Sequence, residues 1–280
     1  RLPVAEELAP RARHGFAANS LLCRAALAGG AIDAWSFTAV RIASGAAALV
    51  GLASLGGKRG EGRGSFLSAL ALYGYAGAFS LAYLSLGAGA LALVLFASVQ
   101  ATMLGWSAWR GARPSARELG GFALAFVGLV VLMLPGVSVP DPLGLALMTL
   151  AGVAWGAYSL RGRTAGAPLV VTRDNFVRAL PLALGALCAA LVFGTLHVSA
   201  RGLALAAASG AAASGLGYSL WYLALSRLTA VRAALLQLSV PVLAAALGIL
   251  LLDEHLTWRL AVAGPLVLVG VGWAVLGRRS

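Results

Sequence analysis

Acidic residues are scarce in this sequence, and charged residues of either sign are few. Only 11% of its 280 residues are charged, with 9 Asp and Glu against 21 Lys and Arg, while 60% are hydrophobic. Soluble domains carry about 25% charged residues. A single globular core of this size could not enclose so much apolar surface, so we expect an integral membrane protein embedded in the lipid bilayer.

The long apolar runs contain no acidic residue in their interiors. Every Asp and Glu lies in or beside a connector between runs. A proton-coupled exporter of cations would need a buried carboxylate to exchange protons for its substrate. His14, His197 and His255 lie near the ends of runs, where they cannot easily form a proton relay at the midplane. Facilitated export down a gradient is therefore favoured over tight proton coupling.

Signals for catalysis and for cofactors are also missing. Cys23 and Cys188 lie within apolar runs at no motif spacing, which indicates no disulfide framework. No nucleophile with a base, metal-ligand cluster or phosphate-binding loop is recognisable. We expect no enzyme, no cofactor and no metal site. The net charge of +12 comes from basic residues in short connectors, which is typical of membrane orientation signals and not of a nucleic-acid partner.

Ten apolar runs are what the sequence does contain. Residues 64–109 hold no charged side chain over a length that suits two spans, with residues 87–89 as the turn between them. The other runs cover 15–32, 34–57, 119–140, 142–160, 179–200, 202–226, 233–252 and 260–277. The first is the weakest, because Arg24 interrupts it. Lipid offers no hydrogen-bond partners to a free backbone, so the runs predict an all-α polytopic membrane protein with ten transmembrane helices.

The connectors between these runs alternate in charge. Counted from the N-terminus, alternate connectors together with both termini carry 16 basic residues, and the connectors on the opposite side carry 2. Basic residues concentrate on the cytoplasmic side of membrane proteins. The alternation therefore predicts cytoplasmic N- and C-termini in a bacterial-type cytoplasmic (inner) membrane.

An internal repeat relates the two halves of the chain. The pair Val40-Arg41 reappears as Val177-Arg178 at an offset of 137, and Ser98-Val99 reappears near half the chain length later, as residues 239–240. We expect a first five-helix repeat over 1–140 and a second over 141–280. Because five is odd, the second copy is inverted, an arrangement that in transporters places the substrate site at the midplane. A duplicated structural bundle without transport is the alternative.

Aromatic and amide side chains inside the runs are the candidates for that site. Tyr75, Phe79 and Tyr83 follow one another at helical spacing, and Tyr218 and Tyr222 repeat the pattern. Rings with hydroxyl tips suit an amphipathic solute, although ordinary packing and interhelical links are the alternatives. Candidate substrate-binding residues are Asn19, Tyr75, Phe79, Tyr83, Gln100, Trp155, Tyr158, Tyr218, Trp221, Tyr222 and Gln237. Pro241 and Pro265 are candidate hinges, since proline interrupts a helix.

Three arginines and several tryptophans fall outside this candidate set. Arg41 and Arg178 correspond across the repeat, so inversion should place them toward opposite faces, where their side chains can reach the interface as structural anchors. Arg24 is expected near a boundary as well. The tryptophans at the ends of runs, namely Trp106, Trp109, Trp258 and Trp273, are expected to be interface anchors.

Three features of the chain resemble a known family. They are its two halves, its Trp155-Gly156 pair and its 229–256 stretch "TAVRAALLQLSVPVLAAALGILLLDEHL". In these features the chain resembles the ten-helix EamA-type members of the drug/metabolite transporter superfamily. The resemblance implies export of a small metabolite, with the amino-acid exporters, including those for aromatic amino acids, as the group it fits. Gln100 stands where the second copy has Pro241, which is a departure from strict symmetry.

These observations leave three functional hypotheses. The leading one is a carrier that exports small amphipathic metabolites, amino acids foremost, by alternating access at a site between the repeats. A nucleotide-sugar or phosphorylated-solute exchanger would require two cationic groups converging on the midplane. A non-transporting membrane partner or lipid flippase subunit would have no midplane cavity. The oligomeric state is left open.

The predicted orientation can be tested by labelling single cysteines with an impermeant thiol reagent. We expect cysteines placed in the basic connectors and at both termini to be protected in right-side-out vesicles, and cysteines in the other connectors to react. Termini that react on different faces would contradict the ten-span count.

Overall fold

A computed structural model describes residues 15–55, 63–84, 88–112, 114–133, 141–164, 166–252, 255 and 257–276. Both termini and Gly87 of the predicted 87–89 turn lie outside these residues, whereas Ala88 and Gly89 are helical, so the predicted turn extends too far. Nearly all of the described residues are helical, and their only β pairing is an isolated bridge between Ile32 and Val198. The predicted all-α class is therefore confirmed.

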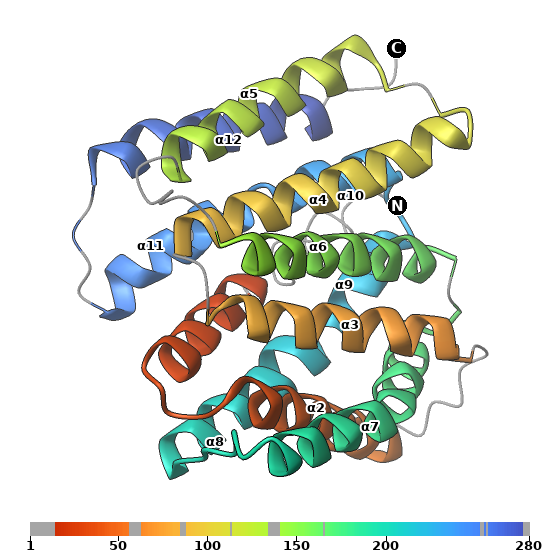
Figure 1. Cartoon of the computed structure of the whole chain (residues 1–280). Coiled ribbons are helices and arrows are strands. Elements are labelled where there is room, and N and C mark those ends of the chain that lie inside the picture. The colour runs from red at the N-terminus through yellow and green to blue at the C-terminus, as the bar shows by residue number, and fades with distance from the viewer. Residues whose placement is uncertain are drawn as a thin grey trace.

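The helices follow the predicted runs in number and order (Figure 1). Residues 15–23 are α-helical and lead into the π-helix η1. The elements that follow are η1 (Arg24–Ala28), α2 (Ala34–Leu55), α3 (Phe66–Ala82), α4 (Ala88–Trp109), α5 (Ala116–Met133), α6 (Pro142–Gly162), α7 (Pro168–Val192), α8 (Ala200–Ala208), the π-helix η3 (Ser209–Leu216), α9 (Gly217–Leu225), α10 (Ala230–Gln237), α11 (Val240–Leu252) and α12 (Trp258–Leu276). With α8, η3 and α9 as one continuous helix and α10 with α11 as one broken span, the described residues form ten helical segments.

Hydropathy places the starts of some helices too late. The run predicted from 179 belongs to α7, which begins at Pro168, so Arg173 and Asp174 of the expected connector lie inside that helix and form an ion pair at 2.7 Å. Among the described residues, six helices are long and apolar enough to cross a bilayer by length and composition, and 66–82 and 230–246 form shorter apolar helices. The polar residues 172–175, in the second turn of α7, interrupt the apolar pattern and separate the start of the helix from the predicted run.

Short polar side chains fix where several helices begin. Ser65, Asp141, Ser199 and Thr229 each accept a hydrogen bond from the backbone N–H three residues ahead, at the starts of α3, α6, α8 and α10. These N-caps satisfy backbone donors that the helix itself leaves unpaired. Polar residues of the connectors therefore determine where these four helices begin.

Helices from the two halves of the chain pack against each other throughout the bundle. Helix α5 lies on α12 at one edge, and α2 lies on α7 at the other (Figure 1). Between these edges, α4 contacts both α6 and α10, and α3 contacts α6. Three of these pairs, α2–α7, α4–α10 and α5–α12, join helices of the same rank in the two predicted repeats, although the inverted duplication itself stays a prediction.

The two connectors around the isolated bridge are also tied together. The Asp33 N–H donates to the His197 carbonyl at 2.8 Å, and the Asp33 carboxylate accepts from the His197 N–H at 3.0 Å. The Ser199 N–H and hydroxyl both donate to the Ala31 carbonyl, at 2.9 and 2.7 Å. The connector between the first helix and α2 is therefore joined to the connector between α7 and α8.

Two glycines allow α4 and α6 to pack with their backbones close together. A Cβ atom added to Gly152 would lie 2.5 Å from the Ser98 Cβ and 2.7 Å from the Leu95 carbonyl oxygen. A Cβ atom added to Gly156, one turn later, would lie 2.8 Å from the Thr102 Cβ. Small residues at such contacts are how membrane helices approach each other.

The Gly152→Ala substitution tests this contact. The added methyl group meets backbone atoms that cannot rotate away, so we expect a loss of stability of about 1–3 kcal/mol, measured as a lower midpoint of thermal unfolding in detergent. Gly185→Ala is the matched control, because nothing lies within 4 Å of its added Cβ. Equal midpoints for the two variants would show that the α4–α6 contact does not depend on glycine.

Candidate solute site in the centre of the bundle

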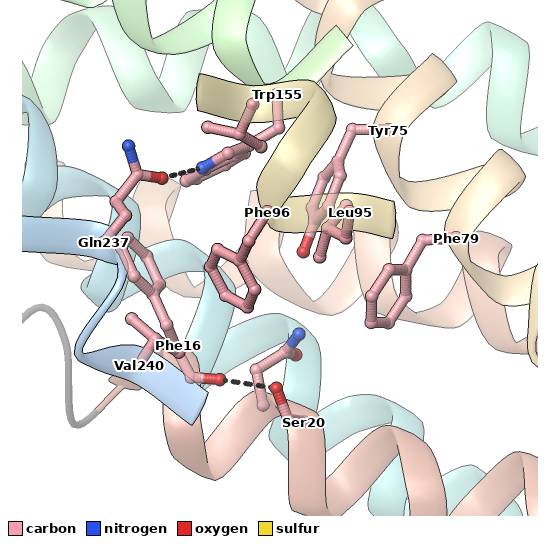
Figure 2. Close-up of a pocket in the computed structure, with 11 residues that line it drawn as sticks. Phe16, Ser20, Tyr75, Phe79, Leu95, Phe96, Trp155, Gln237 and Val240 are labelled. Atoms are coloured by element: carbon pink, nitrogen blue, oxygen red, sulfur yellow. Dashed lines mark hydrogen bonds between the residues drawn. The ribbon is translucent and has the colours of Figure 1, made fainter. Parts of the chain in front are cut away.

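A small cavity lies in the centre of the bundle, where helices from both halves of the chain meet (Figure 2). Its volume is about 30 Å³, which is close to the volume of one water molecule in the liquid. Its walls come from the first helix, α3, α4, α6 and the α10–α11 span. The lining residues are Phe16, Asn19, Ser20, Tyr75, Phe79, Leu95, Phe96, Val99, Trp155, Gln237 and Val240.

Five of the predicted binding residues line this cavity, namely Asn19, Tyr75, Phe79, Trp155 and Gln237. They lie on four different spans, which no local sequence pattern connects. At about 30 Å³, the cavity in this conformation is well below the roughly 300–1,000 Å³ of typical ligand pockets. Binding of a metabolite would therefore require the surrounding helices to move apart.

Aromatic rings form most of one wall. The Trp155 ring lies 4.9 Å from the ring of Tyr75 and 4.6 Å from that of Tyr218, and Phe16 packs edge-on against Trp155 at 5.3 Å. Such offset and edge contacts favour one arrangement of the rings over others. Tyr218 thus belongs to the cluster without lining the cavity.

The remaining predicted aromatic residues extend away from the cavity. Tyr158 stacks on Trp155 at 5.7 Å and lies 4.8 Å from Tyr222, whose hydroxyl donates to the Tyr158 carbonyl. The Trp221 indole donates to the Ser159 hydroxyl at 3.1 Å. These three rings form a buried layer behind the wall.

Tyr83 lies at the end of α3 and contacts only Phe79 among the predicted rings, at 5.0 Å. The helical spacing from Tyr75 through Phe79 to Tyr83 therefore gives a continuous ladder of rings, of which the first two line the cavity and the third lies outside it.

The amide side chains connect helices around the cavity. The Trp155 indole donates to Gln237 Oε1, which joins α6 to α10. Asn19 Oδ1 accepts a hydrogen bond of 2.6 Å from the Ser209 hydroxyl. Gln100 donates to the Ala234 carbonyl at 2.8 Å, and its own buried Oε1 atom has no partner in the structure. Each amide thus acts as an interhelical link here, and two of the three face the cavity as well.

The expectation for Arg41 is wrong. Its side chain is 1% exposed and does not reach an interface. Its Nε donates to the Ser214 hydroxyl at 2.9 Å and its Nη2 to the Tyr218 hydroxyl at 2.6 Å, while the guanidinium lies 5.4 Å from the centre of the Tyr75 ring. The buried Nη1 atom has no partner. Arg41 therefore joins the aromatic cluster that borders the cavity.

The positive charge of Arg41 has no protein counter-ion among the described residues. Its hydrogen-bond acceptors are two neutral hydroxyl groups, and the acidic residues that form ion pairs bind Arg173 and Arg232 instead. A buried charge without an opposite charge is costly, and within membrane spans such residues generally serve a function. Arg41 itself does not line the cavity, but it contacts the ring of Tyr75, which does.

Close packing of η3 on α2 explains why Arg41 is buried. A Cβ atom added to Gly210 would overlap the Arg41 carbonyl group, and one added to Gly45 would overlap the ring of Phe176. This approach places Ser214, on the π-helical part of span eight, directly against the arginine. Arg178, its counterpart in the predicted repeat, is exposed, so reasoning from symmetry led to the wrong prediction.

Span nine is broken beside the cavity. The helix α10 ends at Gln237, Leu238 and Ser239 form a turn, and α11 starts at Val240 with Pro241 in its first turn. Both residues that flank the turn, Gln237 and Val240, line the cavity. Pro265, by contrast, lies inside the continuous helix α12. A hinge function for either proline stays a prediction.

The same fold and the same kind of sequence occur in known proteins. A protein of solved crystal structure superposes with a TM-score of 0.80 over 99% of both chains, at 19% sequence identity. An uncharacterized protein of Pseudomonas aeruginosa is 52% identical over 257 residues, which cover 91% of this chain and 89% of that protein. The threonine/homoserine exporter RhtA of Escherichia coli is 35% identical over 164 residues, 56% of this chain and 54% of RhtA.

Taken with the helical bundle and its central cavity, these similarities define a multi-pass membrane transporter. Residues 142–276 match the EamA-like transporter family. The chain belongs to this family, and with it to the drug/metabolite transporter superfamily.

Replacing Arg41 by methionine tests whether its charge serves the fold. Because an apolar side chain of similar length removes the cost of a buried charge, we expect Arg41→Met to unfold at the same temperature as the wild type or higher. Arg178→Met, at an exposed position, is the matched control and should leave the midpoint unchanged. A large drop for Arg41→Met alone would make this arginine a structural residue.

Proposed function

We propose that this protein exports small amphipathic metabolites, amino acids foremost and aromatic ones among them, by alternating access at the central site between its two halves. The observation that carries the proposal is the buried charge of Arg41, which has no counter-ion among the described residues and contacts two rings of the aromatic cluster around the cavity, Tyr75 and Tyr218. A carboxylate would supply the missing negative charge. The rings would contact the apolar part of the solute.

The number of buried charges favours a monoanionic group over a phosphorylated one. Of the arginines that the structure describes, Arg41 alone is buried. A nucleotide sugar or a phosphorylated solute carries two or more negative charges in its phosphate groups. One guanidinium with one free donor matches a single carboxylate, which an amino acid provides.

The polar groups of the cavity suit the ammonium group of the same solute. Asn19 and Gln237 line the cavity, and their amide oxygens each accept one hydrogen bond, from Ser209 and Trp155, and retain a second lone pair. The buried Gln100 Oε1 atom has no partner among the described residues. Amide oxygens accept hydrogen bonds from an ammonium group without adding charge. An amino acid would thus find complementary partners for both of its charged ends.

Transport requires the closed cavity to open on each side in turn. The link from Trp155 to Gln237 holds α6 against the span that breaks at Leu238. Rearrangement at this break would release the link and widen the cavity at the same point. Broken helices at the midplane are a recurring device of secondary transporters.

Amino acids as substrates are also supported by one relative. RhtA is named a threonine/homoserine exporter, and the similarity to it spans about half of each chain. The aromatic preference rests on the ring cluster alone. The charge of the connectors supports a place in a bacterial cytoplasmic membrane with both termini in the cytoplasm.

Purified protein in liposomes tests the proposal with a panel of labelled amino acids. We expect saturable uptake that the unlabelled amino acid competes, and at least tenfold weaker competition by the corresponding amino-acid amide, which lacks the carboxylate. Arg41→Met should reduce the flux to the level of empty vesicles. Arg178→Met should transport like the wild type.

Each alternative gives a different result in the same assay. Equal signals from empty and protein-containing vesicles for every amino acid would favour a non-transporting membrane partner. Transport with equal competition by acid and amide would retain the carrier and remove Arg41 from substrate recognition.

A further inference from the structure

A second, larger cavity opens on the outside of the bundle between the ends of α4 and α6. Its volume is about 810 Å³, within the range of ligand pockets. The residues that line it are Thr102, Gly105, Trp106, Trp109, Arg110, Ala157, Leu160, Arg161, Arg163 and Thr164. We refer to this set as the α4–α6 groove. None of these residues lines the central cavity, so the two sites are separate.

The groove exists because the two helices diverge from a tight contact. They touch at Gly152 and Gly156, where added Cβ atoms would overlap Ser98 and Thr102. One turn beyond Thr102, nothing lies within 4 Å of a Cβ atom added to Gly105. The helices run side by side in Figure 1, and α6 exposes Leu150 and Val153 on its outer surface. The groove therefore faces the lipid.

The polar end of the groove is strongly basic. Arg110, Arg161 and Arg163 line it, and no Asp or Glu does. None of the three forms an ion pair within the described part of the chain. Their guanidinium groups are instead held by neutral partners: Arg161 donates to Ser65 and Ser68, at 2.9 and 2.8 Å, and Arg163 to the Leu228 carbonyl at 3.2 Å. Three fixed positive charges thus remain without a negative partner.

The aromatic end of the groove has the composition of a membrane interface. Trp106 and Trp109 are 40% and 75% exposed, and the Arg110 guanidinium lies 5.1 and 5.8 Å from the centres of their rings. Exposed tryptophans at helix ends lie at the level of the lipid headgroups. This geometry places the charges of the groove at the depth of the phosphate groups, and its apolar floor below them.

From these features we infer that the α4–α6 groove binds one anionic phospholipid. Its phosphate would lie among the three arginines, and the first part of an acyl chain would lie along Gly105, Ala157 and Leu160. Basic pockets between membrane helices bind anionic headgroups in this way. The inference does not depend on which solute the central site carries.

Binding can be measured on the full chain in neutral detergent by native mass spectrometry with phosphatidylglycerol, phosphatidylcholine or inorganic phosphate. We expect one tightly bound phosphatidylglycerol, with at least tenfold weaker binding of phosphatidylcholine and of phosphate. Arg110→Gln removes one charge that makes no hydrogen bond, and Gly105→Leu fills the groove without changing charge. Each should weaken phosphatidylglycerol binding at least tenfold, while Arg178→Gln should not.

Three outcomes would overturn the inference. Equal binding of the two lipids would show that the arginines do not discriminate an anionic from a zwitterionic headgroup. Inorganic phosphate that binds as tightly as phosphatidylglycerol would make the groove a site for a soluble anion. Wild-type binding by Arg110→Gln and Gly105→Leu, with folding confirmed by the thermal unfolding midpoint, would place the lipid elsewhere.

Discussion

The buried guanidinium group of Arg41, in contact with Ser214, Tyr218 and Tyr75, is the constraint on which the proposed transport site depends. It brings together α2, the continuous α8–η3–α9 helix and α3, and it holds a full positive charge where the surroundings are otherwise apolar or neutral. Hydroxyl groups orient this charge without neutralising it. Within the described part of the chain, this buried positive charge has no negatively charged partner.

The organisation around this charge explains why the cavity is so small. Aromatic rings and amide links close over it from both halves of the chain, with Trp155 bound to Gln237 across α6 and α10. Close contacts at two glycines hold neighbouring helices together: Gly152 of α6 against α4, and Gly210 of η3 against α2. The parts able to yield are the turn at Leu238 and the side chains that line the cavity.

The number and class of the helices could be predicted from the sequence, because apolar length and connector charge report directly on contact with lipid. The start of α7 could not, since the polar residues 172–175 in its second turn interrupt the apolar pattern. The aromatic and amide residues of the site could be picked out span by span from the sequence. Which of them meet at one cavity could not, because that depends on how the helices pack. Arg41 shows why: a sequence repeat suggested an environment like that of Arg178, and close packing at Gly45 and Gly210 produced a different one.

The ties between the connector at Ala31–Asp33 and the one at His197–Ser199 have a consequence for the geometry of transport. They fasten the first two helices to α7 and α8, across the boundary between the two halves of the sequence. Pulling one half bodily away from the other would have to break these bonds. The rigid bodies that move during transport would then each contain helices from both halves, and the boundary between them would differ from the boundary between the two predicted repeats.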